Sequence, residues 1–243
     1  MKNLCAIPAV IFLAFVSSTA AIAQSAKTPL KPGDYITERG WGNLTVKPEK
    51  SGTMSFTLQS LGANFHTCDL EGELRNGKAT LEAMEKNAPC VVTMTATPQG
   101  IEVKASESGT CQYYCGARAQ FEGLYLATPP GCDAKAVAAS RKSFKQLYDA
   151  KKFAEARARL EPVLKACGHI LHWLEDGRIR NDLAVTLHKL DDLAACRTVL
   201  QPLADDAAST DDQVRENFPP SDAEAYLPIV KATRTNLKLC REK

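Results

Sequence analysis

Cysteine content constrains this chain more than any other feature of its sequence. Nine cysteines occur in 243 residues, and one of them, Cys5, lies in an apolar stretch at the start of the chain. Eight remain if that stretch is removed on export: Cys68, Cys90, Cys111, Cys115, Cys132, Cys167, Cys196 and Cys240. An even number of cysteines in an exported protein is typical of a disulfide framework. We therefore expect all eight to be paired.

The first residues have the pattern of a signal peptide. Lys2 supplies a positive charge, residues 7–16 form a short apolar core, and residues 21–23 read A-I-A, a pattern after which signal peptidase cuts. This predicts a signal peptide over residues 1–23, followed by a flexible mature N-terminus over residues 24–33. The apolar core is too short to span a bilayer, and no later segment is long enough to do so. We expect a soluble protein that is periplasmic or secreted.

Two cysteines lie four positions apart in the segment C-Q-Y-Y-C at residues 111–115. This spacing differs from the C-x2-C of thioredoxin-like redox sites and of zinc knuckles, and no second close pair accompanies it. In an oxidising compartment the pair is better explained as a structural cross-link. A redox or metal-binding role is the alternative.

The first half of the mature chain, residues 34–128, alternates between apolar and polar residues in short runs. Examples are T-M-S-F-T-L-Q-S at residues 53–60 and C-V-V-T-M-T-A-T at residues 90–97. Turn residues separate the runs, and Asn76-Gly77 is a strong hairpin signal. Strands that follow one another at this spacing predict an all-β domain, an antiparallel barrel or sandwich.

The second half, residues 133–243, has helical periodicity and repeats itself. Residues 147–163 match residues 187–203 at a shift of forty positions, so that Leu147 falls on Leu187 and Ala156 on Cys196. The matching positions resemble those of a tetratricopeptide (TPR) repeat, which is about 34 residues long. We therefore expect a TPR-like domain of helical hairpins, and hence an α+β chain with two segregated domains. A last helix is predicted over residues 221–240, with Ser221 and Glu224 as a capping box and a kink at Pro228.

Antiparallel helix packing predicts two of the cysteine pairs. The start of one helix in a hairpin lies beside the end of the next, which brings Cys132 to Cys167 and Cys196 to Cys240. In the β half, Cys68 and Cys90 flank the Asn-Gly hairpin, and Cys111 is expected to close on Cys115 across a tight turn. The alternative joins Cys111 or Cys115 to Cys132 across the domain junction.

Nothing in the sequence has the pattern of a known catalytic site. His169 and His172 are followed by Glu175 and Asp176, a spacing that could hold a metal, but a packed helix end explains it better because no partner ligands occur at a comparable spacing. Phosphate-binding loops, nucleophile elbows and zinc-protease motifs do not occur. We therefore expect a protein that is not an enzyme and that binds no cofactor and no metal.

Aromatic residues and an arginine cluster around the C-x3-C segment. Tyr113, Tyr114 and Arg118 are of the types that recur in protein recognition surfaces, and we predict that they bind a partner. The alternative is structural, with Phe121 and Tyr125 in the core and Arg118 in an ion pair.

Three segments of the first half carry a resemblance to a known family. They are G-D-Y-I-T-E-R-G-W-G-N-L-T-V, H-T-C-D-L-E-G and C-Q-Y-Y-C-G-A-R-A-Q-F-E-G-L-Y, all within residues 33–127. This part of the chain resembles small periplasmic domains of the lysozyme-inhibitor-like kind. Inhibitors of c-type lysozyme of this kind use a Ser-Gly-rich loop that ends in lysine and tyrosine. Residues 50–56 are the nearest match, but they lack the tyrosine and place the lysine elsewhere, so no inhibitory residue is transferred.

These features predict a non-enzymatic periplasmic binding protein whose partner is an envelope protein. The resemblance suggests an inhibitor or immunity protein against a cell-wall lytic enzyme (a muramidase) or a toxin. An envelope assembly or scaffold adaptor that acts through the TPR-like domain is the alternative, and a disulfide-stabilised hydrolase comes third. With 30 basic and 28 acidic residues, the chain is close to neutral, which disfavours nucleic acid as a partner.

Overall fold

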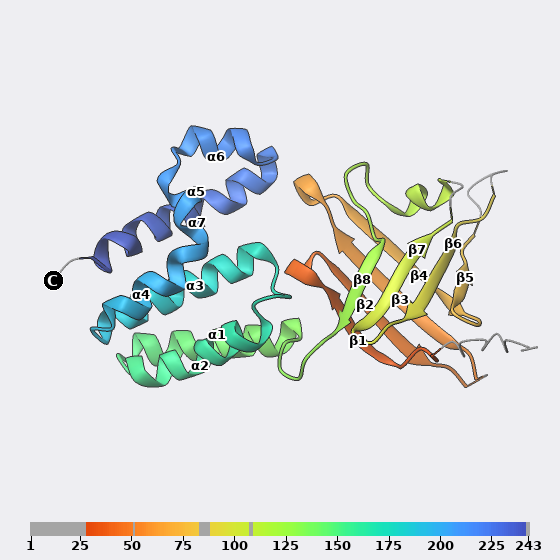
Figure 1. Ribbon diagram of the computed structural model, residues 1–243, viewed down its shortest axis with the longest axis horizontal. Helices are drawn as coiled ribbons and strands as arrows, with labels where there is room; N and C mark the ends of the chain where they lie inside the picture. The colour runs from red at the N-terminus through yellow and green to blue at the C-terminus, as the bar shows by residue number, and fades with distance from the viewer. Residues whose placement is uncertain (1–27, 51, 83–87, 107–108, 242–243) are drawn as a thin grey trace, which may run out of the picture.

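The computed structural model describes residues 28–50, 52–82, 88–106 and 109–241. The predicted signal peptide lies outside these residues. Figure 1 shows a β-barrel on the right and a group of helices on the left, joined by the segment after the last strand. That strand ends at Ala127 and the first helix begins at Ala134.

The alternating runs form an antiparallel sheet that nearly closes into a barrel. Its order is β4-β3-β2-β1-β8-β7-β6-β5. The strands are β1 (Gly33–Thr37), β2 (Gly42–Pro48), β3 (Met54–Leu61), β4 (Thr67–Leu74), β5 (Lys78–Thr80), β6 (Val91–Ala96), β7 (Gly100–Ala105) and β8 (Gly123–Ala127). Alternation explains the core, because Phe56 and Leu58 on β3 and Val92 and Met94 on β6 are buried, whereas their strand neighbours are more exposed. The predicted antiparallel barrel is therefore confirmed.

The barrel has a seam between β4 and β5, the two ends of the sheet. At one end of the seam these strands form the hairpin that the Asn-Gly pair predicted, with the backbone bridge Arg75↔Lys78. Asn76 and Gly77 have φ angles of 53° and 75°, as a tight hairpin turn requires. Beyond this bridge, no backbone pairing joins β4 to β5 among the described residues.

Helices make up the second half of the chain, as predicted. They are α1 (Ala134–Asp149), α2 (Phe153–Cys167), α3 (Trp173–Lys189), α4 (Leu193–Leu200), α5 (Ala204–Ala208), α6 (Asp211–Asn217) and α7 (Pro220–Leu239). The shift of forty residues carries α1 onto α3, and the start of α2 onto the start of α4. Among the described residues, no helix has both the length and the apolar character needed to cross a membrane.

The predicted capping box at the start of the last helix is wrong. Helix α7 begins at Pro220, with Pro219 at its N-cap position, and it includes Pro228. Ser221 therefore lies inside the first turn of the helix, and its backbone N–H donates to the side-chain oxygen of Asn64, at 3.1 Å. A residue of the barrel thus satisfies a free N–H at the start of α7, and Glu224 pairs with Arg215 instead. The capping box occurs at α6, between Thr210 and Gln213.

Barrel and helices share a packed junction. Ile36 on β1 and Leu126 on β8 face each other in the strand register and pack against the core of α1, α2 and α3. The backbone N–H of Arg39 donates to the carbonyl of His169 at 2.8 Å. Gly40 has a φ of 64°, and a Cβ there would lie 2.5 Å from the backbone N of His172, so a side chain would push the two parts of the chain apart.

Four disulfides cross-link the chain. Two are the predicted pairs of the helical half, Cys132–Cys167 and Cys196–Cys240. The other two are Cys68–Cys115 and Cys90–Cys111.

The predicted Cys111–Cys115 closure, the pairing of Cys68 with Cys90 and the alternative with Cys132 are all wrong. The segment between Cys111 and Cys115 is a 3-10 helix that leads into extended backbone, so the two sulfurs reach opposite sides of the seam. Disulfides of this number are typical of proteins from oxidising compartments outside the cytosol.

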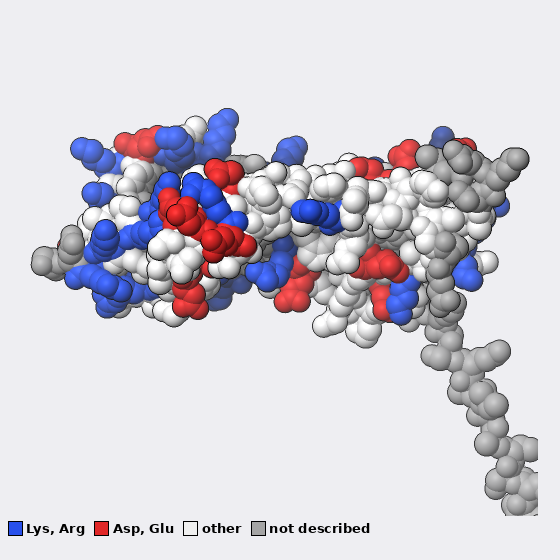
Figure 2. Space-filling model, turned by 90° about the horizontal axis from the view of Figure 1, so that it is seen from above, with Lys and Arg blue, Asp and Glu red and all other residues white. Residues whose placement is uncertain are grey.

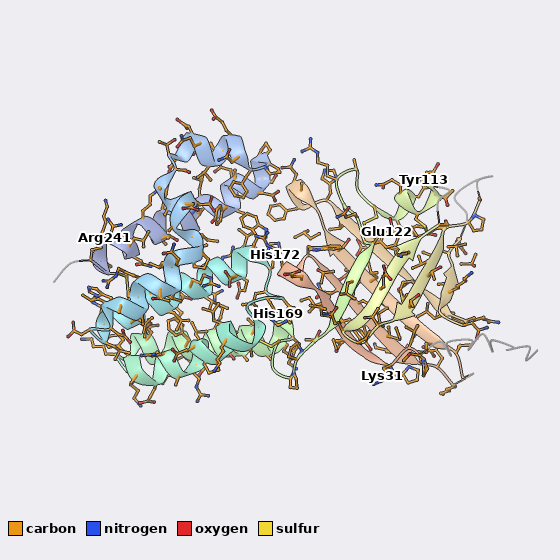
Figure 3. All side chains as sticks on the ribbon, viewed as in Figure 1. Lys31, Tyr113, Glu122, His169, His172 and Arg241 are labelled. Carbon is orange, nitrogen blue, oxygen red and sulfur yellow. A yellow bond between two sulfur atoms is a disulfide. The ribbon has the colours of Figure 1, made fainter. Side chains whose placement is uncertain are left out.

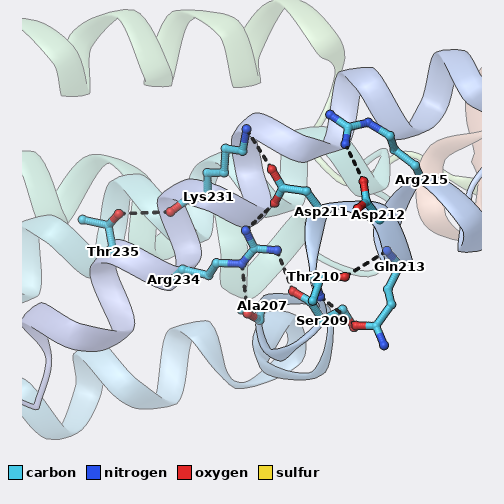
Figure 4. A network of polar contacts seen from close by, with 10 residues as sticks. All are labelled: Ala207, Ser209, Thr210, Asp211, Asp212, Gln213, Arg215, Lys231, Arg234 and Thr235. Atoms are coloured by element: carbon cyan, nitrogen blue, oxygen red, sulfur yellow. Dashed lines mark hydrogen bonds and ion pairs between the residues drawn. The ribbon is translucent and has the colours of Figure 1, made fainter.

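Arg234 on α7 holds the turn between α5 and α6 (Figure 4). Its guanidinium donates to the carbonyls of Ala207 and Ser209 and to the carboxylate of Asp211, which also pairs with Lys231. Hydrogen bonds from Arg234 and Lys231 keep the pKa of Asp211 below its usual value. Arg215, by contrast, makes its ion pairs with Asp212 and Glu224 on the surface.

We expect Arg234→Ala to destabilise the protein by about 2 kcal/mol, since it leaves two backbone carbonyls without their donor and removes one of the two cations that pair with Asp211. Arg215→Ala is the matched control and should change stability far less, because exposed ion pairs contribute little. Urea unfolding with the disulfides intact measures both. Equal losses in the two variants would contradict this role for Arg234.

His172 is a titratable group at the junction whose pKa is shifted. Burial is the main cause of its lowered pKa; Arg178 lowers it further, and Asp222 and Glu175 act in the opposite direction. Because the pKa in the folded state lies below that in the unfolded chain, about 6.5, the unfolded chain binds the proton more readily. The contribution of His172 to stability is therefore complete above about pH 6.5 and is lost as the pH falls toward the folded-state pKa.

Replacing His172 with Gln should thus make stability less dependent on pH between about 7.5 and 5.5, as measured by urea unfolding at several pH values. The exposed neighbour His169 provides the control variant, His169→Gln. A slope in His172→Gln that equals that of the wild type would show that the junction does not titrate.

Candidate partner-binding surface

The strand meander places four connections at one end of the barrel, including the two longest. They join β1 to β2, β3 to β4, β5 to β6, and β7 to β8. The first two contact the helices through Arg39 and Asn64. The β7–β8 connection crosses the barrel seam instead.

We call residues 110–116 of this connection the strap. At one end, Cys111 is bonded to Cys90, just before β6. At the other end, Cys115 is bonded to Cys68 on β4, and the backbone N–H of Gly116 donates to the carbonyl of Thr67 at 2.8 Å. The strap is therefore fixed to both sides of the seam, and this is the role of the C-x3-C segment.

Beyond the strap, the chain packs against the β3–β4 turn. A Cβ on Gly62 would lie 2.0 Å from the carbonyl oxygen of Arg118, so only glycine allows the two loops to approach this closely. The hydroxyl of Ser60 donates to the carbonyl of Gln120 at 2.6 Å. These contacts fix residues 117–120 relative to the end of β3.

Between the two loops lies a hollow of about 430 Å³. It is lined by Trp41, Leu61, Gly62, Ala63, Ala117, Arg118, Ala119 and Gln120. Trp41 packs edge-on against Tyr125 with ring centroids 6.1 Å apart, and its carbonyl accepts from the N–H of Leu61. The hydroxyl of Tyr125 donates to the carbonyl of Phe121, and burial raises its pKa far above the usual value. The tryptophan thus rests on a packed aromatic layer.

Arg118 is exposed at the hollow, and within the described residues it makes no ion pair. Figure 2 shows that the barrel half of this view has few charged residues, whereas charges of both signs crowd the helical half. An unpaired guanidinium beside a tryptophan can bind a carboxylate or stack on an aromatic side chain of a partner.

The β3–β4 turn also presents an exposed aromatic ring. Phe65 is 44% exposed, and Asn64 and Phe65 have φ angles of 56° and 57°. For a bulky residue this left-handed backbone is unusual and costs about 1–3 kcal/mol. Asn64 holds the turn in place, because its N–H donates to Asp222 at 3.1 Å while its side chain accepts from Ser221. The helical half therefore fixes the position of Phe65.

The three predicted binding residues do not all lie at the hollow. Arg118 lines the hollow, but Tyr113 and Tyr114 do not. The hydroxyl of Tyr114 donates to the carbonyl of Glu82 at 2.8 Å, which helps to anchor the strap. Tyr113 is 57% exposed on the strap, and Figure 3 shows it on the side of the barrel remote from the helices. Phe121 and Tyr125 are buried in the core, as the structural alternative expected.

Neither Trp41 nor Phe65 was predicted from the sequence as a binding residue. Trp41 follows a turn glycine and could be assigned to the core as readily as to a surface. Phe65 was the clearer signal, because an aromatic residue in the polar turn G-A-N-F-H has no regular element in which to be buried.

His169 and His172 serve the junction between the two halves (Figure 3). The carbonyl of His169 accepts from Arg39, and the backbone of His172 lies against Gly40. In the part of the chain that the structure describes, no group of three or more His, Cys, Asp or Glu residues is placed to hold a metal ion.

Comparisons with protein-family models, with curated proteins and with solved structures found no match to this chain. The functional interpretation therefore depends on the geometry of the hollow and its surrounding loops.

Proposed function

We propose that this protein is a non-enzymatic binding protein of the periplasm, and that it recognises an envelope protein through the hollow that contains Trp41 and Arg118. The observation that supports this most directly is that one depression combines a tryptophan with an exposed arginine that has no ion pair in the described part of the chain. Tryptophan and arginine are among the residues that most often dominate the binding energy of protein interfaces.

The loops around the hollow are held before any partner arrives. Two disulfides fix the strap, and hydrogen bonds to α7 fix the turn that carries Phe65. A preorganised surface loses little conformational entropy on binding and so keeps more of its contact energy as affinity. This favours a tight, specific partner.

The partner we propose is a cell-wall lytic enzyme, such as a muramidase, or a toxin that the protein restrains. The signal-peptide pattern and the cross-links support this proposal, because disulfides of this number are typical of proteins outside the cytosol, where such enzymes act. Phe65 and Trp41 would contact apolar groups of the partner, and Arg118 would contact a carboxylate.

An envelope adaptor is the second candidate, and a groove between α1 and α3 favours it. The groove has a volume of about 460 Å³ and includes the side chains of Lys142, Phe144, Tyr148 and Val185. If the repeated helix pairs act as TPR-like units, this groove would bind a segment of another protein.

A disulfide-stabilised hydrolase is the third candidate function. A cysteine nucleophile would need a free thiol, yet Cys68, Cys90, Cys111, Cys115, Cys132, Cys167, Cys196 and Cys240 all lie in disulfides. None of them therefore offers a thiolate for catalysis.

Lysis of cell walls by purified muramidases and envelope toxins, followed by turbidity, tests the proposed function. The wild-type protein should suppress lysis by one of them, and Trp41→Ala and Arg118→Glu should each weaken suppression at least tenfold. Lys104→Glu is the matched control, because Lys104 is also an exposed barrel cation but lies outside the hollow.

Two results would contradict this function. Suppression that survives Arg118→Glu and Trp41→Ala would place the binding surface elsewhere. Unchanged lysis, combined with loss of an envelope complex in the variant Tyr148→Ala, would favour the adaptor.

A further inference from the structure

At the end of the barrel opposite the strap, short turns join the strands. These turns are at residues 49–53, 75–77 and 97–99. Gly52 has a φ of 77°, and apart from its chain neighbours no atom of the described residues lies within 4 Å of the position that its Cβ would occupy. In the part of the chain that the structure describes, the barrel interior opens at this end into a cavity of about 600 Å³. This volume is within the range of small-molecule sites, about 300–1,000 Å³.

The floor of the cavity is apolar. Met54, Leu74 and Met94 line it, and each continues the inward-facing row of its strand. Leu74 and Met94 are each 3% exposed, whereas Met54 is partly exposed at the opening. Methionine side chains adapt their shape to a flexible apolar ligand.

The segment before β1 forms one wall. Leu30 lines the cavity and packs against the barrel core. The hydroxyl of Tyr35 donates to the carbonyl of Lys31 at 2.7 Å and so holds this segment against the barrel. The wall is thus part of the folded barrel, and the cavity has an apolar side as well as an apolar floor.

The rim carries one sign of charge. Lys78 is the one charged residue among the described residues that line the cavity, and it makes no ion pair within them. It follows the tight turn at Asn76-Gly77, so its position at the rim is fixed by the hairpin while its long side chain can reach the opening. An apolar interior with a single cation at the rim is complementary to an amphiphile with a negative head group.

We propose that this end of the barrel binds a single-chain amphiphilic acid, with its alkyl chain on Met54, Leu74 and Met94 and its carboxylate near Lys78. The site is independent of the proposed protein partner, because it lies at the other end of the barrel from the hollow with Trp41 and Arg118. Either proposal can therefore fail without the other.

Calorimetric titration of the full chain with monomeric dodecanoate tests the site. We expect saturable binding of one molecule, at least tenfold weaker binding of dodecyltrimethylammonium, and no binding of acetate. Lys78→Gln should weaken dodecanoate binding about tenfold. Lys47→Gln is the matched control, since Lys47 is also an exposed strand lysine at this end but does not line the cavity.

Two further variants separate this site from others on the protein. Ala96→Phe fills the cavity and should abolish binding, with circular dichroism showing that the fold is kept. Met54→Glu, at the partly exposed edge, should reverse the preference from dodecanoate to dodecyltrimethylammonium. This variant still tests the site if Ala96→Phe does not fold.

Three outcomes of the titrations would overturn the proposal. They are no binding of dodecanoate, equal binding of the two amphiphiles of opposite charge, and binding that Met54→Glu leaves unchanged. Binding to vesicles of anionic phospholipid without binding of monomeric dodecanoate would also overturn it, and would indicate a membrane surface as the partner.

Discussion

Covalent closure of the barrel seam is the constraint on which the rest of the β half depends. A sheet that ends in β4 and β5 would expose two strand edges wherever they separate, and exposed edges invite pairing with other chains. The strap lies across this gap, with Cys115 bonded to Cys68 on one side and Cys111 bonded to Cys90 on the other. Closing loops with sequence separations of 47 and 21 residues is expected to add roughly 2–4 kcal/mol for each bridge in the loop-entropy model.

The same end of the barrel is fixed by the helices. Asn64 satisfies an N–H group at the start of α7, Gly40 allows the chain to pass close to His172, and Ile36 and Leu126 complete a helical core. The helical half therefore positions the turn that presents Phe65, beside the hollow of Trp41 and Arg118. The opposite end has short turns and an open mouth, so the two ends of one barrel suit two kinds of ligand.

Much of the fold followed from local patterns in the sequence. Alternation predicted the strands, Asn76-Gly77 predicted the hairpin, and helical hairpins predicted the Cys132–Cys167 and Cys196–Cys240 bonds, because adjacent helices pack on each other. The barrel disulfides were not predictable in this way, since they depend on where the sheet fails to close. The start of α7 was also misassigned, because its hydrogen-bond acceptor, Asn64, lies 157 residues away in the sequence. Within the candidate site, Arg118 was predicted as a binding residue from the sequence. Trp41 was not, because only the folded barrel brings it to the same hollow.

The most direct test is a disulfide map of protein purified from the cell envelope without reduction. Chymotrypsin can cut after Tyr113 or Tyr114 and so separate Cys111 from Cys115, and trypsin can cut after Arg75 or Lys78 and so separate Cys68 from Cys90. Mass spectrometry should then find Cys111 linked to Cys90 and Cys115 linked to Cys68. Peptides that join Cys111 to Cys115, or Cys68 to Cys90, would contradict a strap fixed across the seam.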